Sequence, residues 1–276
     1  MRLPDSLRWP GDIDFSNTIN DIVYTGHSGS IGSSMPEGPY PLHTRLEHPI
    51  EEMKNEICSL SLQAWAFVHL AGLVSVRDCE ADPDLAYAIN VEGAKKWFQA
   101  SCQSSCQHFV FVSSSHVFAP PLCREVLTPE SPVGPRSVYS KTKLAAENAL
   151  KELAEQYPNT KLTIARVFSV LSEAMRPGFL LTNLHNRAKN KDFSPIPGLS
   201  YIRDFLEAPA ICQKLLKLTK NPAAPNLVLI CSGSGRSIRQ ITEQVFTQYG
   251  LGTTLLQEAP RKTDDIPYIV GLPSQF

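Results

Sequence analysis

The chain has 276 residues, of which 42% are hydrophobic and 19% charged, and its net charge is −1. This length and composition allow one large domain or two modest ones with a sizeable core, and they exclude an intrinsically disordered chain. The near-neutral charge argues against a nucleic-acid-binding protein, and no apolar run approaches the 18 or so residues that a membrane span needs.

Strands and helices alternate along the first part of the chain. Short apolar runs predict strands, in chain order over 21–26, 40–46, 65–72, 107–115 and 161–170. Helical apolar spacing predicts helices over 50–62, 83–102 and 137–157. The Gly/Ser stretch behind the first strand is typical of a turn into one more helix. This alternation predicts an α/β fold with a doubly wound parallel sheet over 20–170, preceded by an N-terminal extension over 1–19.

The composition of the chain changes after residue 170, where Pro and Gly recur between short elements. Residues 208–218 and 237–250 have helical spacing, and residues 226–233 form an apolar run that predicts a strand. We expect a smaller, irregular C-terminal substrate-binding lobe over most of 171–276. The strand over 226–233 is expected to return to the main sheet.

Three glycines follow the first predicted strand in "TGHSGSIG", namely Gly26, Gly29 and Gly32. The first permits a tight turn, the second lets backbone approach a pyrophosphate, and the third allows close helix–strand packing. With the backbone of Ser30 and Ile31 they form a candidate cradle for dinucleotide phosphates at a helix N-terminus. A purely structural Gly-rich turn would show the same glycines, but the preceding strand favours dinucleotide binding.

The residues at the end of the second strand decide between NAD and NADP. An acidic residue there would accept a hydrogen bond from the ribose 2′-hydroxyl of NAD, whereas an arginine suits a 2′-phosphate. The candidates are Arg45 and Glu47 in "HTRLEHP". Arg45 lies nearer the expected strand end and favours NADP(H). A solvated charged loop would show the same residues, so both cofactors stay open.

Tyr139 and Lys143 stand four residues apart in a predicted helix, so both side chains can point into one site. A nearby ammonium favours the phenolate and is expected to lower the pKa of the tyrosine, which could then exchange a proton with a sugar hydroxyl. "FVFVSSSHVF" supplies Ser113, Ser114 and Ser115 as candidate hydroxyls at the end of a strand. Alone, the Tyr/Lys pair fits a surface helix better than an active site; the glycine turn and the serines in this order reverse that preference.

From about residue 20 the chain resembles the extended short-chain dehydrogenase/reductases of the nucleotide-sugar branch. "TGHSGSIG" is similar to that family's TGxxGxxG, "VHLAG" to its HLAA strand, "INVEG" to its N-V-x-G helix and "SSSHVF" to its SSxxVY motif. The resemblance implies a Rossmann domain binding NAD or NADP, with Leu70, Ala71, Gly72 and Asn90 beside the cofactor. It also makes Ser114, 25 residues before the tyrosine, the catalytic hydroxyl.

The same resemblance implies a nucleotide-sugar substrate. "YIRDFLEAPA" and "APRKTDD" are similar to two family motifs whose arginines hold the nucleotide diphosphate, which carries over to Arg203 and Arg261. Asn183 in "LLTNL" matches another phosphate-contacting position. Surface charge in loops is the alternative for the two arginines. The family often dimerises through the tyrosine helix, so a homodimer is expected.

Departures from the family pattern reduce the number of reactions that the resemblance leaves open. Ser115 and His116 stand where dehydratases have Asp and Glu, so sugar 4,6-dehydration is not expected. Both residues are instead candidate substrate contacts, although a lone histidine is often a packing residue. The resemblance therefore leaves an epimerase that retains its NAD, or a reductase that uses NADPH on a 4-keto sugar. A dinucleotide-binding protein without turnover is the third possibility, and all three candidate catalytic residues argue against it.

The cysteines and the N-terminal sequence indicate a cellular compartment and whether a metal site is expected. Seven cysteines without CxxC pairs or histidine clusters predict reduced thiols in a cytoplasmic protein, with neither a zinc site nor a disulfide framework. The first twenty residues lack the apolar stretch of a signal peptide.

Overall fold

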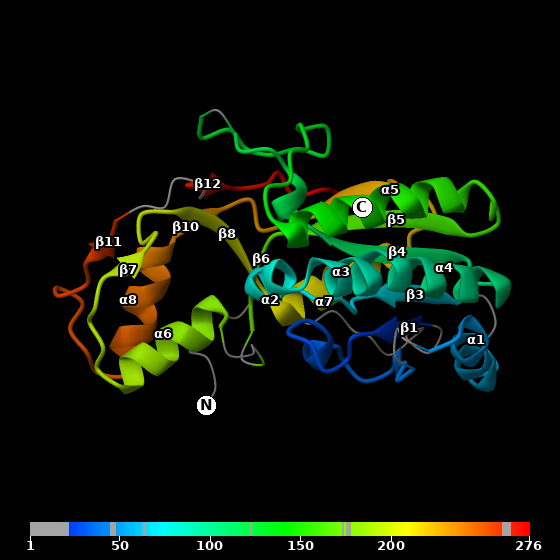
Figure 1. Ribbon diagram of the computed structural model, residues 1–276, viewed down its shortest axis with the longest axis horizontal. Helices are drawn as coiled ribbons and strands as arrows, with labels where there is room; N and C mark the ends of the chain where they lie inside the picture. The colour runs from blue at the N-terminus through cyan, green and yellow to red at the C-terminus, as the bar shows by residue number, and fades with distance from the viewer. Residues whose placement is uncertain are drawn as a thin grey trace.

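The computed structural model describes residues 22–44, 48–62, 65–121, 123–172, 174, 178–260 and 266–276. Its centre is a six-stranded sheet in the order β2, β1, β3, β4, β5, β9, in which every neighbouring pair is parallel (Figure 1). The strands are β1 (Ile22–Thr25), β2 (Tyr40–Pro41), β3 (Ala66–His69), β4 (His108–Ser114), β5 (Lys161–Val167) and β9 (Leu227–Ile230). The predicted α/β fold is confirmed, and the strand over 226–233 does return to the main sheet.

Helices cover both faces of this sheet, which is why its central strands are continuous apolar runs. On one face, α1 (Ile50–Ser59), α4 (Gly93–Gln103) and α5 (Val138–Ala154) enclose a core that includes Trp97 and Phe109. On the other face, α7 (Ala208–Thr219) packs through its apolar side chains against Val110 and neighbouring strand residues. Every residue of β1, β3 and β4 is buried as a result.

The segment after the glycine turn differs from the prediction. In place of the expected helix there is one 3₁₀ turn, Gly32–Ser34, after which Met35 is extended. Pro36 and Pro39 explain the difference, because a proline disfavours helical geometry in the residue before it and lacks an amide hydrogen for the helix. The second strand is correspondingly short, spanning only Tyr40–Pro41.

The predicted helix over 83–102 consists of three joined pieces. These are α3 (Pro83–Tyr87), a π-helical turn (Ala88–Glu92) and α4. Such π turns often occur at functional sites, and this one carries Asn90. Two further helices, α2 (Val76–Ala81) and α6 (Leu180–Lys189), were not predicted. No helix in the described residues is long and apolar enough to span a bilayer.

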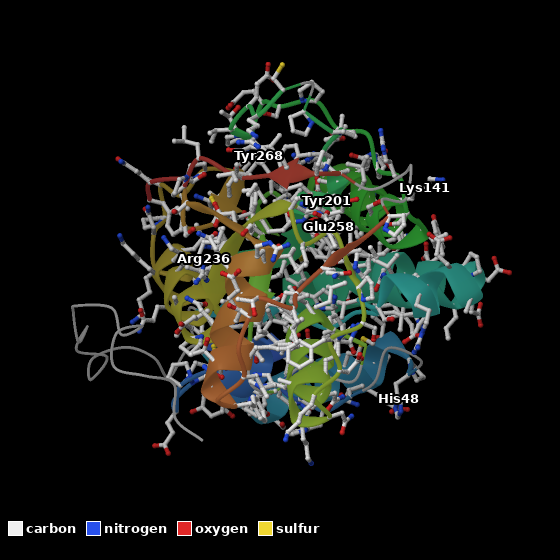
Figure 2. The ribbon with its side chains drawn as sticks, turned by 90° about the vertical axis from the view of Figure 1, so that its left-hand side faces the viewer. His48, Lys141, Tyr201, Arg236, Glu258 and Tyr268 are labelled. Carbon is white, nitrogen blue, oxygen red and sulfur yellow. The ribbon has the colours of Figure 1, made fainter. Side chains whose placement is uncertain are left out.

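A second core lies beside the carboxyl ends of the central strands (Figure 1). It is built from α6 and α8 (Ile238–Gln248), with a two-stranded pair, β7 (Ile196–Pro197) and β11 (Glu258–Ala259). A small sheet borders it, made of β6 (Ser169–Leu171), β8 (Ile202–Glu207), β10 (Gly235–Ser237) and β12 (Tyr268–Ile269). Figure 2 looks onto this lobe and labels Tyr201, Arg236, Glu258 and Tyr268 among its side chains.

A buried ion pair joins helix α5 to the central sheet. Glu147 on α5 and Arg166 on β5 meet at 2.7 Å, with side chains 0% and 4% exposed. Ser113 on β4 donates to the same carboxylate at 2.6 Å, and the Arg166 guanidinium lies 4.6 Å from the centre of the Phe118 ring. Because these charges are out of water, their hydrogen bonds must hold the helix in one position on the sheet.

We predict that Glu147→Ala lowers the free energy of unfolding by about 3–5 kcal/mol, because it leaves the Arg166 charge buried without its partner. Replacing both residues, as Glu147→Leu with Arg166→Met, should cost much less. The exposed pair Glu92–Lys95 offers a control, and Glu92→Ala should cost no more than about 1 kcal/mol. Urea denaturation measures all three, and equal losses for the single and double changes would contradict this account.

Candidate active site

Ser114 and Tyr139 meet where β4 ends and α5 begins. Ser114 is buried, and its Oγ accepts a hydrogen bond from the backbone N–H of His116 at 3.2 Å. Its hydroxyl also lies close enough to the Tyr139 phenol to act on the pKa of that group. The rings of His116 and Tyr139 lie edge to face, with centroids 6.1 Å apart. The structure therefore brings together three of the side chains that the sequence predicted for one site.

The first turn of α5, which carries the tyrosine, is held from two sides. Ser137 caps the helix and exchanges hydrogen bonds with Ser140, forming a capping box. From α2, Glu80 Oε1 accepts from the backbone N–H of Val138 at 2.8 Å. A carboxylate at a helix N-terminus is favourable because of the helix dipole. Glu80 was not predicted, because its position in the sequence gives no sign that it reaches α5.

The pKa of Tyr139 is not shifted in the direction that the sequence predicted. The half-buried Tyr139 has its pKa raised by burial, which outweighs the opposing effect of its hydrogen bond with Ser114. The expected lowering of this pKa by Lys143 is therefore wrong for this structure. The physical reason is where the ammonium is held, one turn farther into the protein.

Lys143 is buried beneath the site and bound to the sheet. Its Nζ donates to the Val112 carbonyl oxygen at 2.7 Å and lies 4.2 Å from the centre of the Phe111 ring. Burial lowers the pKa of Lys143 to about 8, while the negative charge of Glu147 acts in the opposite direction. Glu147 lies four residues after Lys143, so helical spacing in "KLAAE" was the signal that could have identified it.

The glycine turn is as tight as its sequence predicted. Gly26 has φ +76°, and a Cβ there would lie 2.8 Å from the Ala71 backbone nitrogen. A Cβ on Gly32 would lie 2.2 Å from the Gly26 carbonyl oxygen, so neither position tolerates a side chain. Gly29 closes the turn by donating its N–H to Gly26 at 2.9 Å.

The turn is anchored through its own carbonyl groups. Ser30 accepts a hydrogen bond from Ser172 Oγ at 2.8 Å, and Ile31 accepts one from Cys212 Sγ at 3.3 Å. These contacts fix the turn against the start of the C-terminal lobe and against α7. Among the described residues, they take the place of the helix expected after the turn.

The loop after β3 is tied to both the glycine turn and α5. This loop contains Leu70, Ala71 and Gly72, and the Ala71 N–H donates to Thr25 Oγ1 at 3.2 Å. The Asn90 side chain accepts from Leu73 N–H at 2.7 Å and donates to the Leu73 carbonyl oxygen at 2.9 Å. It also donates to Thr142 Oγ1 on α5 at 3.0 Å. A Cβ on Gly72 would lie 2.9 Å from Asn90 Oδ1, so this loop and the asparagine are closely packed.

The candidate substrate residues lie on different elements. Ser115 is buried in a 3₁₀ turn, whereas His116 is open to solvent. The protein around the ring and the positive charge of Arg203 both disfavour the charged form of His116 and lower its pKa. Arg203 on β8 is thus close enough to act on the catalytic end of the sheet. Asn183 is exposed on α6, where its Nδ2 donates to the Gly178 carbonyl oxygen at 3.3 Å.

Two predicted arginines cannot be assessed, and one arginine was missed. Arg45 and Arg261 lie outside the described residues. Arg236 on β10 is the direct cross-strand neighbour of Arg203, so the two side chains leave the sheet on the same face. The Arg236 guanidinium lies 5.7 Å from the centre of the Phe205 ring. Only the pairing of β8 with β10 shows this juxtaposition, which is why the sequence did not.

The residues present fit a dinucleotide at the glycine turn. Gly26 and Gly32 have no room for a side chain against the neighbouring backbone, so the chain there keeps the tight turn on which a pyrophosphate could rest. The segment that follows on the adenosine side is a 3₁₀ turn in place of a longer helix. Within the described residues, no three His, Cys, Asp or Glu side chains are grouped to hold a metal ion.

Comparison with known proteins places this site in context. Residues 53–231 match the family described as NAD dependent epimerase/dehydratase. The chain is 33% identical over 104 residues to UDP-glucose 4-epimerase 2 of Oryza sativa subsp. japonica, covering 38% of this chain and 25% of that protein. It is 27% identical over 194 residues to GDP-6-deoxy-D-mannose reductase of Pseudomonas aeruginosa, covering 64% of this chain and 61% of that protein. The chain thus aligns to less than two thirds of either relative.

A solved structure extends the likeness to nearly the whole chain. UDP-glucose 4-epimerase of Thermotoga maritima, determined with UDP-glucose, superposes with a TM-score of 0.79 over 92% of this chain and 90% of its own. The two sequences are 17% identical, so this likeness establishes the fold alone. The fold that it establishes is the Rossmann-type fold expected from the sequence.

We predict that His69, beneath the site, makes the protein less stable in acid. Its Nδ1 lies 2.9 Å from Thr25 Oγ1, and burial, with a smaller effect from Lys143, lowers its pKa to about 3 from 6.5. Between pH 6.5 and about 3, the unfolded chain binds a proton at His69 that the folded chain does not. The free energy of unfolding therefore decreases as the pH is lowered, by up to about 1.4 kcal/mol per pH unit.

Urea denaturation between pH 7 and 4 tests this prediction. The free energy of unfolding should fall less steeply in His69→Gln than in the wild-type protein, because one linked proton is removed. His48→Gln, on the outside of the molecule (Figure 2), is the control. Parallel curves for the wild type and His69→Gln would show that His69 does not carry this linkage.

Proposed function

Because the chain belongs to the NAD dependent epimerase/dehydratase family, we propose that it is an NAD(P)-dependent nucleotide-sugar epimerase. The family's members are enzymes, and those similar to this chain include epimerases, dehydratases and reductases of nucleotide sugars. The observation that supports the proposal is the meeting of Ser114 and Tyr139 at the end of β4, above the buried Lys143. The end of β4 and the start of α5 lie on the side of the sheet that faces the second lobe (Figure 1).

In this proposal Tyr139 moves the proton and Ser114 orients the sugar. The phenolate of Tyr139 takes the proton from a ring hydroxyl while the Ser114 hydroxyl hydrogen-bonds the same oxygen. Once the carbon has also given up its hydride, the sugar is a ketone, which would turn before it is reduced again. Tyr139 then returns the proton to the oxygen as the hydride returns to the carbon. Lys143 holds the helix that carries the phenol through its bond to the Val112 carbonyl oxygen, and Asn90 keeps the neighbouring loop and α5 in register.

A bound dinucleotide would supply the hydride acceptor and donor. The glycine turn would hold its pyrophosphate, with the backbone of Gly29, Ser30 and Ile31 nearest to it. Arg203, and Arg236 beside it, would bind the diphosphate of the nucleotide sugar, because paired guanidinium groups suit phosphate oxygens. We keep Arg261 as a further candidate for the same diphosphate.

The second candidate is an NADPH-dependent 4-keto nucleotide-sugar reductase. It is favoured by the extent of the similarity to the Pseudomonas aeruginosa reductase, which reaches 64% of this chain against 38% for the rice epimerase. The same three catalytic residues would serve a single hydride transfer. In either case we propose a cytoplasmic homodimer, and light scattering tests the oligomeric state.

The dinucleotide released when the purified protein is denatured separates these candidates. Tightly retained NAD supports the epimerase, whereas exchangeable NADPH with one-way reduction of a 4-keto sugar supports the reductase. Turnover should be screened with UDP-, dTDP-, GDP- and CDP-sugars while cofactor absorbance is followed. A protein that binds neither dinucleotide would contradict both candidates.

We predict that Tyr139→Phe lowers turnover by about 10²–10⁴-fold while leaving dinucleotide affinity nearly unchanged, because only the proton-carrying hydroxyl is lost. Turnover is measured with the nucleotide sugar identified in the screen, and affinity by calorimetry. Tyr87→Phe is the matched control, since this tyrosine is exposed on α3. Full activity in Tyr139→Phe would refute the assigned role.

A further inference from the structure

The end of β2 carries a carboxylate that comes from another element. The Leu42 N–H donates to the Tyr24 carbonyl oxygen at 2.8 Å, which continues the pairing of β2 with β1 by one residue. Immediately afterwards, the backbone N–H groups of His43 and Thr44 donate to Glu56 on α1. The two distances are 2.6 Å to Oε1 and 2.9 Å to Oε2. Both oxygens of this carboxylate are therefore fixed at the carboxyl end of the second strand.

This carboxylate lies beside the glycine turn. The His43 ring packs edge-on against the ring of His27, with centroids 4.6 Å apart. His27 directly follows Gly26, the first glycine of the turn. In doubly wound sheets the adenosine ribose lies at the end of the second strand, next to the glycine turn, and an acidic residue there binds its 2′-hydroxyl. Glu56 therefore occupies the place of that acidic residue, although it belongs to a helix.

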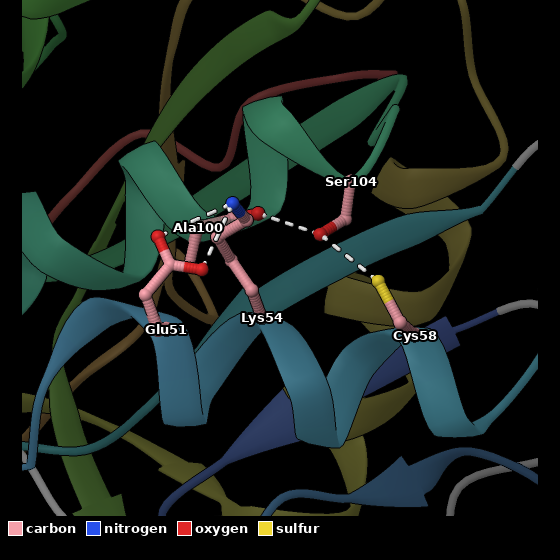
Figure 3. A network of polar contacts seen from close by, with 5 residues as sticks. All are labelled: Glu51, Lys54, Cys58, Ala100 and Ser104. Atoms are coloured by element: carbon pink, nitrogen blue, oxygen red, sulfur yellow. Dashed lines mark hydrogen bonds and ion pairs between the residues drawn. The ribbon is translucent and has the colours of Figure 1, made fainter.

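Helix α1 holds the carboxylate rigidly. Met53 and Ile57 are buried in the main core, on either side of Glu56 in the sequence. Figure 3 shows α1 alongside α4, where Cys58 Sγ lies 3.9 Å from Ser104 Oγ and Ser104 Oγ donates to the Ala100 carbonyl oxygen at 2.9 Å. A group fixed in this way can select between ligands, because it cannot move aside at low cost.

We infer that Glu56 receives the hydroxyl groups of the cofactor's adenosine ribose and thereby makes the protein select NAD over NADP. This inference rests on the proposed function, since it requires that a dinucleotide binds. A carboxylate has about four lone-pair sites, and the backbone of His43 and Thr44 uses two of them. The others can accept from the 2′- and 3′-hydroxyls, whereas a 2′-phosphate would place like charges together.

The shortened segment explains why a helix provides the acid. β2 ends after two residues, and its next residues, Leu42, His43 and Thr44, include no carboxylate. The sequence-based expectation was that Arg45 favours NADP(H). The position of Glu56 reverses that preference, because its negative charge lies at the strand end from which a 2′-phosphate would have to be bound.

Binding measurements on the full chain test the inference without relying on turnover. The dissociation constants of NAD⁺ and NADP⁺ are measured by calorimetry, after bound nucleotide has been removed with charcoal. We expect the wild-type protein to bind NAD⁺ at least about tenfold more tightly than NADP⁺. Glu56→Gln should lower this ratio about tenfold, because it removes the charge while keeping the shape. Glu51→Gln, exposed on the same helix, should leave the ratio unchanged.

The ratio is taken on one preparation, so partial unfolding of a variant affects both cofactors equally. If Glu56→Gln does not fold, Glu56→Asp is used, which withdraws the carboxylate by one methylene and should also reduce the preference for NAD⁺. A wild-type preference for NADP⁺, or a ratio unchanged by the Glu56 substitutions, overturns the inference but leaves the proposed function standing. Binding of neither dinucleotide to the wild type refutes the proposed function and the inference with it.

Discussion

The arrangement of the candidate site depends on one buried ion pair. Glu147 and Arg166 fasten α5 to β5, and Ser113 adds a contact from β4. Lys143, one helical turn earlier, is bound to β4 by its own hydrogen bond. Charges removed from water tolerate little displacement, because losing a partner costs several kcal/mol. The helix that carries Tyr139 is therefore fixed on the sheet before any ligand arrives.

The nucleotide end of the site follows a different principle, in which a short segment is replaced by contacts from elsewhere. Prolines between Gly32 and β2 prevent the usual helix, and the glycine turn is held instead by Ser172 and Cys212. An acid from α1 reaches the strand end. The end of β4 and the start of α5 thus keep the residues expected of the family, while the segment between the glycine turn and β2 is held by neighbouring elements.

Sequence reasoning succeeded where the signal was local and failed where it depended on packing. Continuous apolar runs identified β1, β3, β4, β5 and β9, and the resemblance to the family's motifs assigned Ser114 and Tyr139 to one site. The glycine motif predicted the start of a helix, and Pro36 and Pro39 limit that start to a single 3₁₀ turn. The pKa of Tyr139 was misjudged for another reason: residue spacing shows which face Lys143 occupies but not how deeply its ammonium lies. Glu56, Glu80 and Arg236 act across elements that only the tertiary structure brings together.

The two arginines that oppose each other across β8 and β10 have a consequence for the molecule as a whole. Like charges placed directly opposite on neighbouring strands repel, so this small sheet is less stable than its hydrogen bonding alone would make it. An anion bound between the guanidinium groups relieves that repulsion, and any ligand that binds only the folded form raises its stability. Under the proposed function, the diphosphate of the substrate would therefore stabilise this lobe as it binds, so that occupancy and rigidity would rise together.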